Sequence, residues 1–478
     1  MYKLKLLIVS IIFLSISCKK ENNGQRTVAK YEEDPSIIQD QYGRQLILHG
    51  LNTSSSAKSE PQRNPWIAES DVDREAKEFG FNFVRYLIFW DNIEPEKDVF
   101  SEAYLDRIQE RVEWYTNRKM YVMLDMHQDL YALKFGGDGA PDWAIRPNGK
   151  EPIDLGAETP WWLKNIDPAV VNSWINFWSY TNHKDLQDHY ALAWQKVAER
   201  FKDNPYVIGY DLMNEPWGGD LLKVFITGEF ERKQLYDFYN RLIPKIRAID
   251  QNKYLFFEPT PAPVTFGAPS NLPAIIDTRT PSKLVYAPHC YPYDTHEGLG
   301  YSASSKKNLI DWERERKKDV TQKNNNIPLV TGEFGLSPNN AEFDVYLTDF
   351  MNMSDRNQWH WTYWSNDRGG WSPLNDDGTE TAILQYLVRT YPKAIAGKII
   401  SLNFDNSTKV FTMTYSSNPT INKPTEIFVP NRFYPSGYNV QVNGTDKYII
   451  TKDEVTQTIN IDVNEIIATE VTITIEKK

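Results

Sequence analysis

The sequence predicts an α/β protein with a (β/α)8 barrel followed by a small C-terminal antiparallel β-sandwich. Between residues 35 and 394, short apolar runs alternate with segments of helical period, a pattern typical of parallel strands joined by helices. From residue 395 to 478 the chain changes to short alternating runs without helical stretches. A chain of 478 residues also exceeds what one hydrophobic core usually holds, which favours a large domain and a small one.

The barrel prediction depends on the number of apolar runs. Helical periods over 104–115, 185–202, 231–249 and 378–391 predict outer helices between them. An open doubly wound sheet is the alternative, but it would usually show a Gly-rich phosphate-binding turn after its first strand, and none occurs. The eight runs are "LILHGLN" (46–52), "FNFVRYLIF" (81–89), "YVMLDMH" (121–127), "VIGYDLMNEP" (207–216), "YLFFEP" (254–259), "LVYAPHCY" (284–291), "PLVTGEFG" (328–335) and "HWTYWSND" (360–367).

Two flanking segments complete the domain plan. "IIQDQYGRQLILHG" has a Tyr-Gly turn between apolar runs and predicts a hairpin that closes the barrel floor. The C-terminal sandwich could bind sugar or brace the barrel, and its few aromatics favour bracing.

The N-terminus is typical of an export signal. Residues 1–18 carry two lysines, the apolar run "LLIVSIIFLSIS" and then Cys18, and the run is too short to span a bilayer comfortably. The segment resembles a bacterial lipobox, so we expect cleavage that leaves a lipid anchor on Cys18, with plain secretion as the alternative. Residues 19–34 then predict a flexible tether. Cys290 is the only other cysteine, so no disulfide is expected.

Composition excludes several classes of function. A net charge of -11 argues against a nucleic-acid partner, which would require clustered Lys and Arg. The seven histidines form no i, i+4 pair with an acidic neighbour and there is no Cys cluster, so neither a metal nor another cofactor is expected.

The last residues of the eight runs are unusually polar. In a (β/α)8 barrel the working side chains stand at the C-terminal ends of the strands, so these positions should share one rim. A purely structural barrel would have little reason to gather so many titratable groups there. The positions are His49, Asn52, Arg85, His127, Asp129, Asn214, Glu215, Glu258, His289, Tyr291, Glu333 and Trp364.

Glu215 in "DLMNEP" and Glu333 in "LVTGEFG" are the candidate catalytic pair. They end the fourth and seventh runs, which face each other across a barrel mouth, so one can protonate a glycosidic oxygen while the other attacks the anomeric carbon. Mutual repulsion should raise the pKa of one of them. Taken singly, Glu215 could be a helix cap and Glu333 a barrel salt-bridge partner. Glu258 is a rival carboxylate, but its Pro-rich flank indicates a structural or supporting role.

These motifs resemble glycoside hydrolase family 5. The resemblance implies that Glu215 is the acid/base and Glu333 the nucleophile, that Asn214 contacts the sugar 2-hydroxyl, and that Arg85 and Tyr291 hydrogen-bond the nucleophile. The residues that match the family pattern are Arg85, His127, Asn214, Glu215, His289, Tyr291, Glu333 and Trp364.

Within that family the chain looks like the endoglycoceramidases, on the stretches "HGLNTSSSAK", "DMHQDLYALKFGGDGAPDWA" and "QDHYALAWQKVAERFKDNPYVIGYDLMNEPWGG". The similarity implies that Lys58, Asp129 and Trp178 contact the sugars before the scissile bond. Their ordinary interpretations are a solvated Lys, a capping Asp and a core Trp. The substrate implied is a glycosphingolipid, cut between oligosaccharide and ceramide.

An apolar segment suited to contact a lipid substrate follows Glu215. "DLLKVFITG" crowds Leu221, Leu222, Val224, Phe225 and Ile226 directly after "NEPWGG". An amphipathic helix packed on the barrel would explain the same pattern equally well.

The resulting hypothesis is an exported, lipid-anchored and monomeric retaining endo-β-glycosidase acting on glycosphingolipids at a membrane surface. One alternative is a related β-glycosidase acting on galactosylceramide, steryl glucoside or β-glucan. A second is a non-catalytic surface protein that binds glycans, although binding alone has no need for a paired acid and nucleophile.

Overall fold

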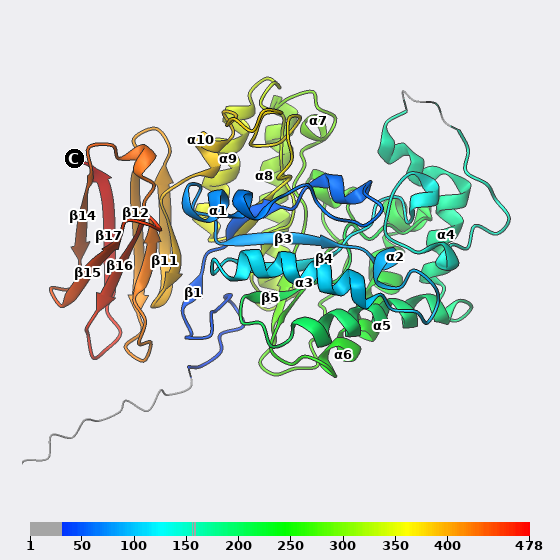
Figure 1. Cartoon of the computed structure of the whole chain (residues 1–478), viewed down its shortest axis with the longest axis horizontal. Helices are drawn as coiled ribbons and strands as arrows, with labels where there is room; N and C mark the ends of the chain where they lie inside the picture. Colours follow the sequence, from blue (N-terminus) through cyan, green and yellow to red (C-terminus); the bar gives the residue numbers. More distant parts are fainter. Residues whose placement is uncertain (1–30, 155, 157–158) are drawn as a thin grey trace, which may run out of the picture.

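The computed structural model describes residues 31–154, 156 and 159–478. In this described part, eight parallel strands lie in the order β7-β6-β5-β4-β3-β2-β9-β8, and a parallel bridge between Tyr286 and Leu329 joins the two ends into a closed barrel (Figure 1). Each strand falls inside one predicted run, so the (β/α)8 prediction is confirmed. The strands are β2 (His49–Asn52), β3 (Phe83–Ile88), β4 (Tyr121–Met126), β5 (Val207–Asp211), β6 (Tyr254–Phe257), β7 (Leu284–Tyr286), β8 (Val330–Thr331) and β9 (His360–Tyr363).

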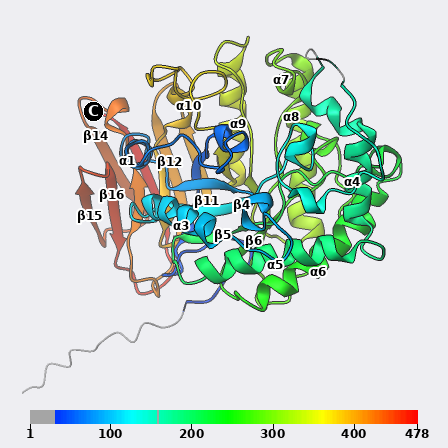
Figure 2. The same cartoon turned by 45° about the vertical axis from the view of Figure 1, so that its right-hand side comes forward.

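Helices surround the barrel because their apolar faces cover its outer surface (Figure 2). Between β6 and β7 the chain is irregular apart from the 3-10 turn Val264–Phe266. The longer helices are α1 (Glu69–Lys77), α3 (Glu102–Thr116), α4 (Pro168–Trp178), α5 (Lys184–Phe201), α6 (Tyr236–Arg247), α8 (Ala303–Lys318) and α9 (Phe343–Asn357). The shorter ones are α2 (Trp90–Ile93), α7 (Tyr293–His296) and α10 (Leu384–Leu387), and π-helical turns cover Leu222–Ile226, Phe230–Leu235 and Asp319–Lys323.

The helix predicted over 378–391 is wrong. Only α10 is helical there, and Tyr391 opens strand β10 (Tyr391–Ile395). Pro392 disfavours a helical conformation at Tyr391, and the segment pairs with strands on both of its sides. Tertiary pairing therefore overrides the local helical period.

The floor of the barrel is closed by the N-terminal hairpin, as predicted. Gln39 pairs with Gln45 across the Tyr-Gly turn, and Ile38 is fully buried. Ile38 belongs to the cluster of inward-facing barrel residues that includes Phe83, Met123 and Phe256. The rim formed by the carboxyl ends of the strands lies at the opposite end of the barrel.

The C-terminal domain is a sandwich of two antiparallel sheets (Figure 1). One has the order β1-β10-β13-β16-β15 and the other β11-β12-β17-β14 in the described chain. Because β1 and β10 belong to the sandwich, it recruits two N-terminal residues and begins a few positions before 395. The bounds are β1 (Gln45–Leu46), β11 (Gly397–Asp405), β12 (Val410–Ser417), β13 (Thr425–Phe428), β14 (Tyr438–Asn443), β15 (Tyr448–Asp453), β16 (Thr458–Val463) and β17 (Glu470–Lys477), with a 3-10 turn at Asn431–Phe433.

The sandwich braces the side of the barrel through buried polar contacts. Asp355 at the end of α9 pairs with Arg389 and accepts a hydrogen bond from the Phe404 main-chain nitrogen of β11 at 3.1 Å. Gly80, before β3, has φ +72°, and a Cβ there would lie 2.2 Å from the Phe428 ring of β13. Only glycine fits that left-handed turn and close approach.

Glu75 on α1 makes stability depend on pH. Burial, and then repulsion from Asp71, raise the pKa of Glu75 to about 8 from 4.5, and one carboxyl oxygen accepts from Asn366 at 2.5 Å while the other has no partner. The folded state thus binds the proton more tightly, and stability falls as pH rises from about 4.5 to 8.

We expect Glu75→Gln to remove this loss and to stabilise the protein at pH 8 by on the order of 1–3 kcal/mol. Thermal melts at pH 5 and pH 8 measure it, with Glu78→Gln, an exposed residue directly after the same helix, as the control. A variant whose melting temperature keeps the wild-type dependence on pH would refute the assignment.

Candidate active site

The rim residues enclose a cavity of about 240 Å³ at the carboxyl ends of the barrel strands. Two larger hollows, of about 540 and 440 Å³, lie beside the N-terminal segment at the floor end of the barrel. We place the site in the smaller cavity because it brings together opposed carboxylates from different strands. Its lining residues are Lys58, Asp129, Asn214, Glu215, Tyr291, His296, Glu333, Trp364 and Trp371.

A fully buried Arg85 on β3 organises the base of the site. Its Nε bonds Asp211 at 2.9 Å and one terminal nitrogen lies 3.0 Å from Asp125. That terminal nitrogen also donates to Asn214 at 2.8 Å, and the other terminal nitrogen donates to Glu333 at 2.9 Å. Five donors in a rigid fork suit this many acceptors, so one side chain fixes residues from several strands.

Glu333 follows β8 and receives two donors. Arg85 contacts Oε1 at 2.9 Å and the Tyr291 hydroxyl donates to Oε2 at 3.0 Å. Burial raises the pKa of Glu333 and the charge of Glu215 adds to the rise, whereas the cations His289 and Arg85 oppose it. The two donors hold the Glu333 carboxyl group in one orientation.

Glu215 follows β5 and is held in an unusual backbone conformation. Its φ is +42°, a region that side-chain-bearing residues rarely adopt, and it faces the cavity with partial exposure. His289 Nδ1 lies 2.9 Å from Glu215 Oε1 and 3.6 Å from Glu333 Oε2. Carboxyl oxygens of Glu215 and Glu333 lie within 4.8 Å of each other, which matches the short separation of retaining glycosidases.

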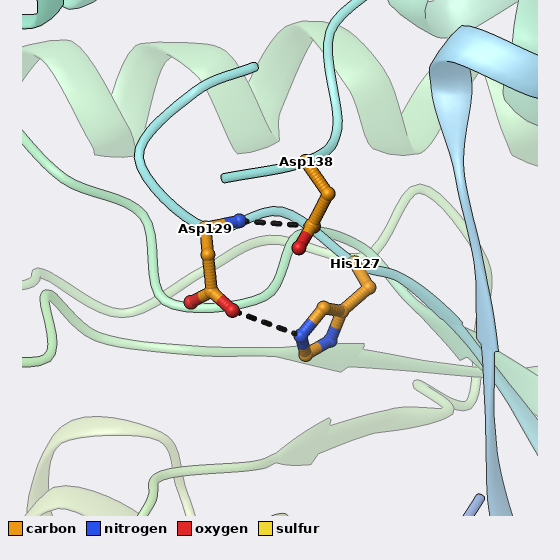
Figure 3. A group of neighbouring side chains, drawn as sticks. All are labelled: His127, Asp129 and Asp138. Atoms are coloured by element: carbon orange, nitrogen blue, oxygen red, sulfur yellow. Dashed lines mark hydrogen bonds and ion pairs between the residues drawn. The ribbon is translucent and has the colours of Figure 1, made fainter. Parts of the chain in front are cut away.

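A second group of polar side chains, which includes His127, Asp129 and Asp138, follows strand β4 (Figure 3). Lys58 Nζ bonds Asp129 at 2.6 Å and lies 4.2 Å above the Trp364 ring, which stacks on His127. The Asp129 main-chain nitrogen donates to Asp138 at 3.1 Å. Because the Lys58 ammonium already neutralises Asp129, a metal ion bound here would meet a like charge. Fixed charges and an indole face suit sugar hydroxyls and a sugar ring instead.

Trp178, an implied sugar contact, and His49, an expected rim residue, both lie away from the cavity. Trp178 is only 4% exposed, its indole N–H donates to the Trp217 carbonyl at 2.7 Å, and its ring packs against Trp174 and Phe230. It belongs to the aromatic core between α4 and the barrel, not to the cavity wall. His49 stacks on Trp361 at 4.3 Å, away from the cavity.

Sequence reasoning missed Asp125, Asp211, His296 and Trp371. The two aspartates interrupt otherwise apolar strands, and a charge inside a buried strand was the available signal. His296 ends the short helix α7, Trp371 lies on a loop, and both reach the cavity only through the fold. Trp162 contacts His296 edge-on at 6.3 Å, so loops from opposite sides meet at this wall.

A carboxylate pair at this separation, across the mouth of a (β/α)8 barrel, defines the chain as a retaining glycoside hydrolase. Residues 39–370 match the family model described as cellulase (glycosyl hydrolase family 5), and residues 389–475 match the glycoside hydrolase family 5 C-terminal domain. The chain belongs to glycosyl hydrolase family 5.

Several of the similar proteins are endoglycoceramidases. Endoglycoceramidase I of Rhodococcus hoagii is 31% identical over 435 residues, which cover 87% of this chain and 83% of that protein. An endoglycoceramidase of Hydra vulgaris is 27% identical over 89% of this chain and 87% of its own length. Endo-glycoceramidase II from Rhodococcus sp., in its complex with ganglioside GM3, is 33% identical with a TM-score of 0.86, over 93% of this chain and all of that one.

Proposed function

We propose that this protein is a retaining endo-β-glycosidase that releases the oligosaccharide of glycosphingolipids from ceramide. Glu333 is the nucleophile, because Arg85 and Tyr291 both donate to it and orient it as a carboxylate. Glu215 is the acid/base, because it lies across the cavity from Glu333. His289 contacts one of its carboxyl oxygens, and its side chain is partly exposed to solvent. Lys58, Asp129, Asn214 and Trp364 bind the sugars.

The reaction proceeds in two displacements. A Glu333 oxygen bonds the anomeric carbon while Glu215 gives its proton to the glycosidic oxygen, so the carbon–oxygen bond breaks and ceramide leaves as an alcohol. Glu215 then takes a proton from water, which attacks the anomeric carbon and displaces Glu333. The sugar leaves with its original configuration, and both carboxyl groups return to their starting protonation.

The observation that supports a lipid aglycone is an exposed apolar segment directly after the acid/base. Leu221, Leu222, Phe225 and Ile226 are 42, 58, 45 and 76% exposed, whereas Val224 is buried. Phe225 contacts Trp217, two residues after Glu215, with ring centroids 5.9 Å apart. A helix packed on the barrel would bury these side chains, so their exposure favours a lipid-contact surface over ordinary packing.

A substrate panel tests the proposed function. Incubation with ganglioside, lactosylceramide, globoside, galactosylceramide and cellulose, followed by mass spectrometry, should show intact oligosaccharide and free ceramide from the first three. Release of soluble sugar from cellulose alone, or products only from galactosylceramide, would contradict the proposal and favour a related β-glycosidase. No release from any of them would favour a glycan-binding protein.

Phe225→Asp should separate lipid binding from chemistry. A charge in the apolar segment disfavours contact with ceramide, so we expect kcat/KM on lactosylceramide in mixed micelles to fall roughly 10- to 100-fold. Activity on a soluble aryl lactoside should stay within about twofold, since the carboxylate pair is unaffected.

The matched control is Ile449→Asp, an equally exposed apolar position on strand β15 of the sandwich. It should leave both activities unchanged. Equal losses of Phe225→Asp on the two substrates would contradict a lipid-contact role for this segment.

We also propose that the protein is exported and anchored to a membrane by a lipid on Cys18. The support is the sequence of residues 1–18, which lie outside the described residues. Among the described residues, no helix is long and apolar enough to cross a membrane. Labelled palmitate should enter the wild type and not Cys18→Ala, and a soluble, unlabelled wild type would favour plain secretion.

A further inference from the structure

Glu258 lies directly behind the proposed acid/base without lining the cavity. It follows β6 and is 2% exposed, and both its main-chain nitrogen and its carbonyl oxygen are hydrogen-bonded to a residue of α6. Its main-chain nitrogen donates to the Tyr239 hydroxyl at 3.1 Å, and that hydroxyl donates to the Glu258 carbonyl at 2.8 Å. The carboxyl group is therefore anchored to the barrel wall.

Both carboxyl oxygens of Glu258 face groups of the catalytic set. Oε2 accepts the main-chain N–H of Glu215 at 2.9 Å. Oε1 lies 3.1 Å from an Arg85 terminal nitrogen and 3.3 Å from His289 Nε2. The other ring nitrogen of His289 is the one that contacts the Glu215 carboxyl group.

We propose that Glu258 is a positioning residue for the acid/base, holding the Glu215 main chain through one oxygen and the His289–Glu215 contact through the other. This inference rests on the proposed function, because it assumes that Glu215 delivers a proton to the leaving group. It assigns to Glu258 no contact with substrate.

The backbone of Glu215 explains why such support is required. A residue at φ +42° persists only when its surroundings hold it there. The Gln128 side chain donates to the Glu215 carbonyl at 3.0 Å, and Glu258 accepts from its N–H. Of these two partners, Glu258 also contacts His289, which in turn contacts the Glu215 carboxyl group. Glu258 therefore positions both the main chain and the side chain of Glu215.

Glutamine cannot replace Glu258 in this arrangement. Each oxygen meets an N–H donor, whereas a glutamine amide presents one acceptor and one NH2 donor. In either orientation the NH2 group would face Glu215 N–H or the Arg85 and His289 cations. Glu258→Gln should therefore misplace the acid without changing the size of the side chain.

The experiment compares leaving groups of different basicity. Ceramide would leave lactosylceramide as a strongly basic alkoxide unless the glycosidic oxygen is protonated, whereas the weakly basic dinitrophenolate leaves a dinitrophenyl lactoside without acid assistance. We expect Glu258→Gln to lower kcat/KM on lactosylceramide roughly 100-fold and on the dinitrophenyl lactoside less than about threefold. Retained activity on the second substrate shows that the variant is folded and that Glu333 still works.

Glu231→Gln is the matched control. Glu231 is another buried glutamate, which accepts from the Thr260 main chain and Ser270 and makes no contact with Glu215 or His289 in the described structure. Any loss in this variant should be equal on the two substrates. An equal loss on both substrates in Glu258→Gln, or no loss on either, would overturn the proposal.

Wild-type activity separates this inference from the proposed function. If the wild type cleaves the dinitrophenyl lactoside but no glycolipid, the proposed function fails, and the comparison is repeated with an unactivated alkyl lactoside. Should Glu258→Gln not fold, Glu258→Asp, which is one methylene shorter, takes its place with the same expected difference between substrates.

Discussion

Glu333→Gln should lose activity on every substrate, lipid or soluble, by roughly 10⁴- to 10⁶-fold. The amide is almost the same size, and its oxygen can still accept from Arg85 while its NH2 group faces the Tyr291 hydroxyl, but it cannot form the covalent bond to the sugar. Rates of ceramide release and of aryl lactoside cleavage measure the loss. Glu313→Gln, on the outer helix α8, is the control and should be fully active.

Glu215→Ala should behave differently from the nucleophile variant. Without the acid we expect ceramide release to fall about 10²- to 10⁴-fold, with a smaller loss on a dinitrophenyl lactoside. Azide should restore turnover in this variant by attacking the lactosyl-enzyme without base assistance, giving a β-lactosyl azide. An α-azide product from Glu215→Ala would reverse the assigned roles. Rescue of Glu333→Gln to the same β-azide would exclude them.

Arg85→Met should produce the largest loss of stability. It removes the cation that contacts four buried carboxyl groups, which then lose their shared partner. These groups belong to Asp125, Asp211, Glu258 and Glu333. Loss of one partner from such a buried network costs about 3–5 kcal/mol. Thermal unfolding at pH 7 measures this loss as a lower melting temperature of the barrel.

The sign of the pH dependence gives a second readout for this variant. Burial raises the pKa values of Asp125, Glu258 and Glu333, and the Arg85 cation opposes that rise. Without Arg85 these three pKa values rise further in the folded state, so the loss of stability grows as pH rises above their unfolded values and disappears below them. The deficit should therefore shrink as pH falls from 7 towards 5. Arg314→Met, an exposed ion-pair residue on α8, should melt as the wild type does, and an equal shift in both variants would contradict the special role of Arg85.

The sequence was sufficient for the barrel and for most of its rim. Strands buried on both faces must be apolar along their whole length, and the eight runs were visible for that reason. The chemistry of opposed carboxylates was also visible, because Glu215 and Glu333 end runs whose order in a closed barrel places them across the mouth. The segment 378–391 was misassigned because its helical period is real over Ile383–Val388 but ends where β10 finds partners on either side.

The tertiary structure decided the supporting residues and the aromatic contacts. Trp178 and Trp371 are equally aromatic in the sequence, yet the first is sealed in the core by its bond to the Trp217 carbonyl and the second lines the cavity. Asp125, Asp211 and Glu258 acquire their roles only because the closed barrel brings them to one guanidinium.

Local sequence thus determined the fold class, the candidate pair of carboxylates and the apolar segment that follows Glu215, since each depends on residue type and spacing along one strand or loop. Which side chains share Arg85, which tryptophan meets the sugar and how Glu215 is held at φ +42° depend on residues 40 to 250 positions apart. Those contacts follow from the closure of the barrel, and no local pattern encodes them.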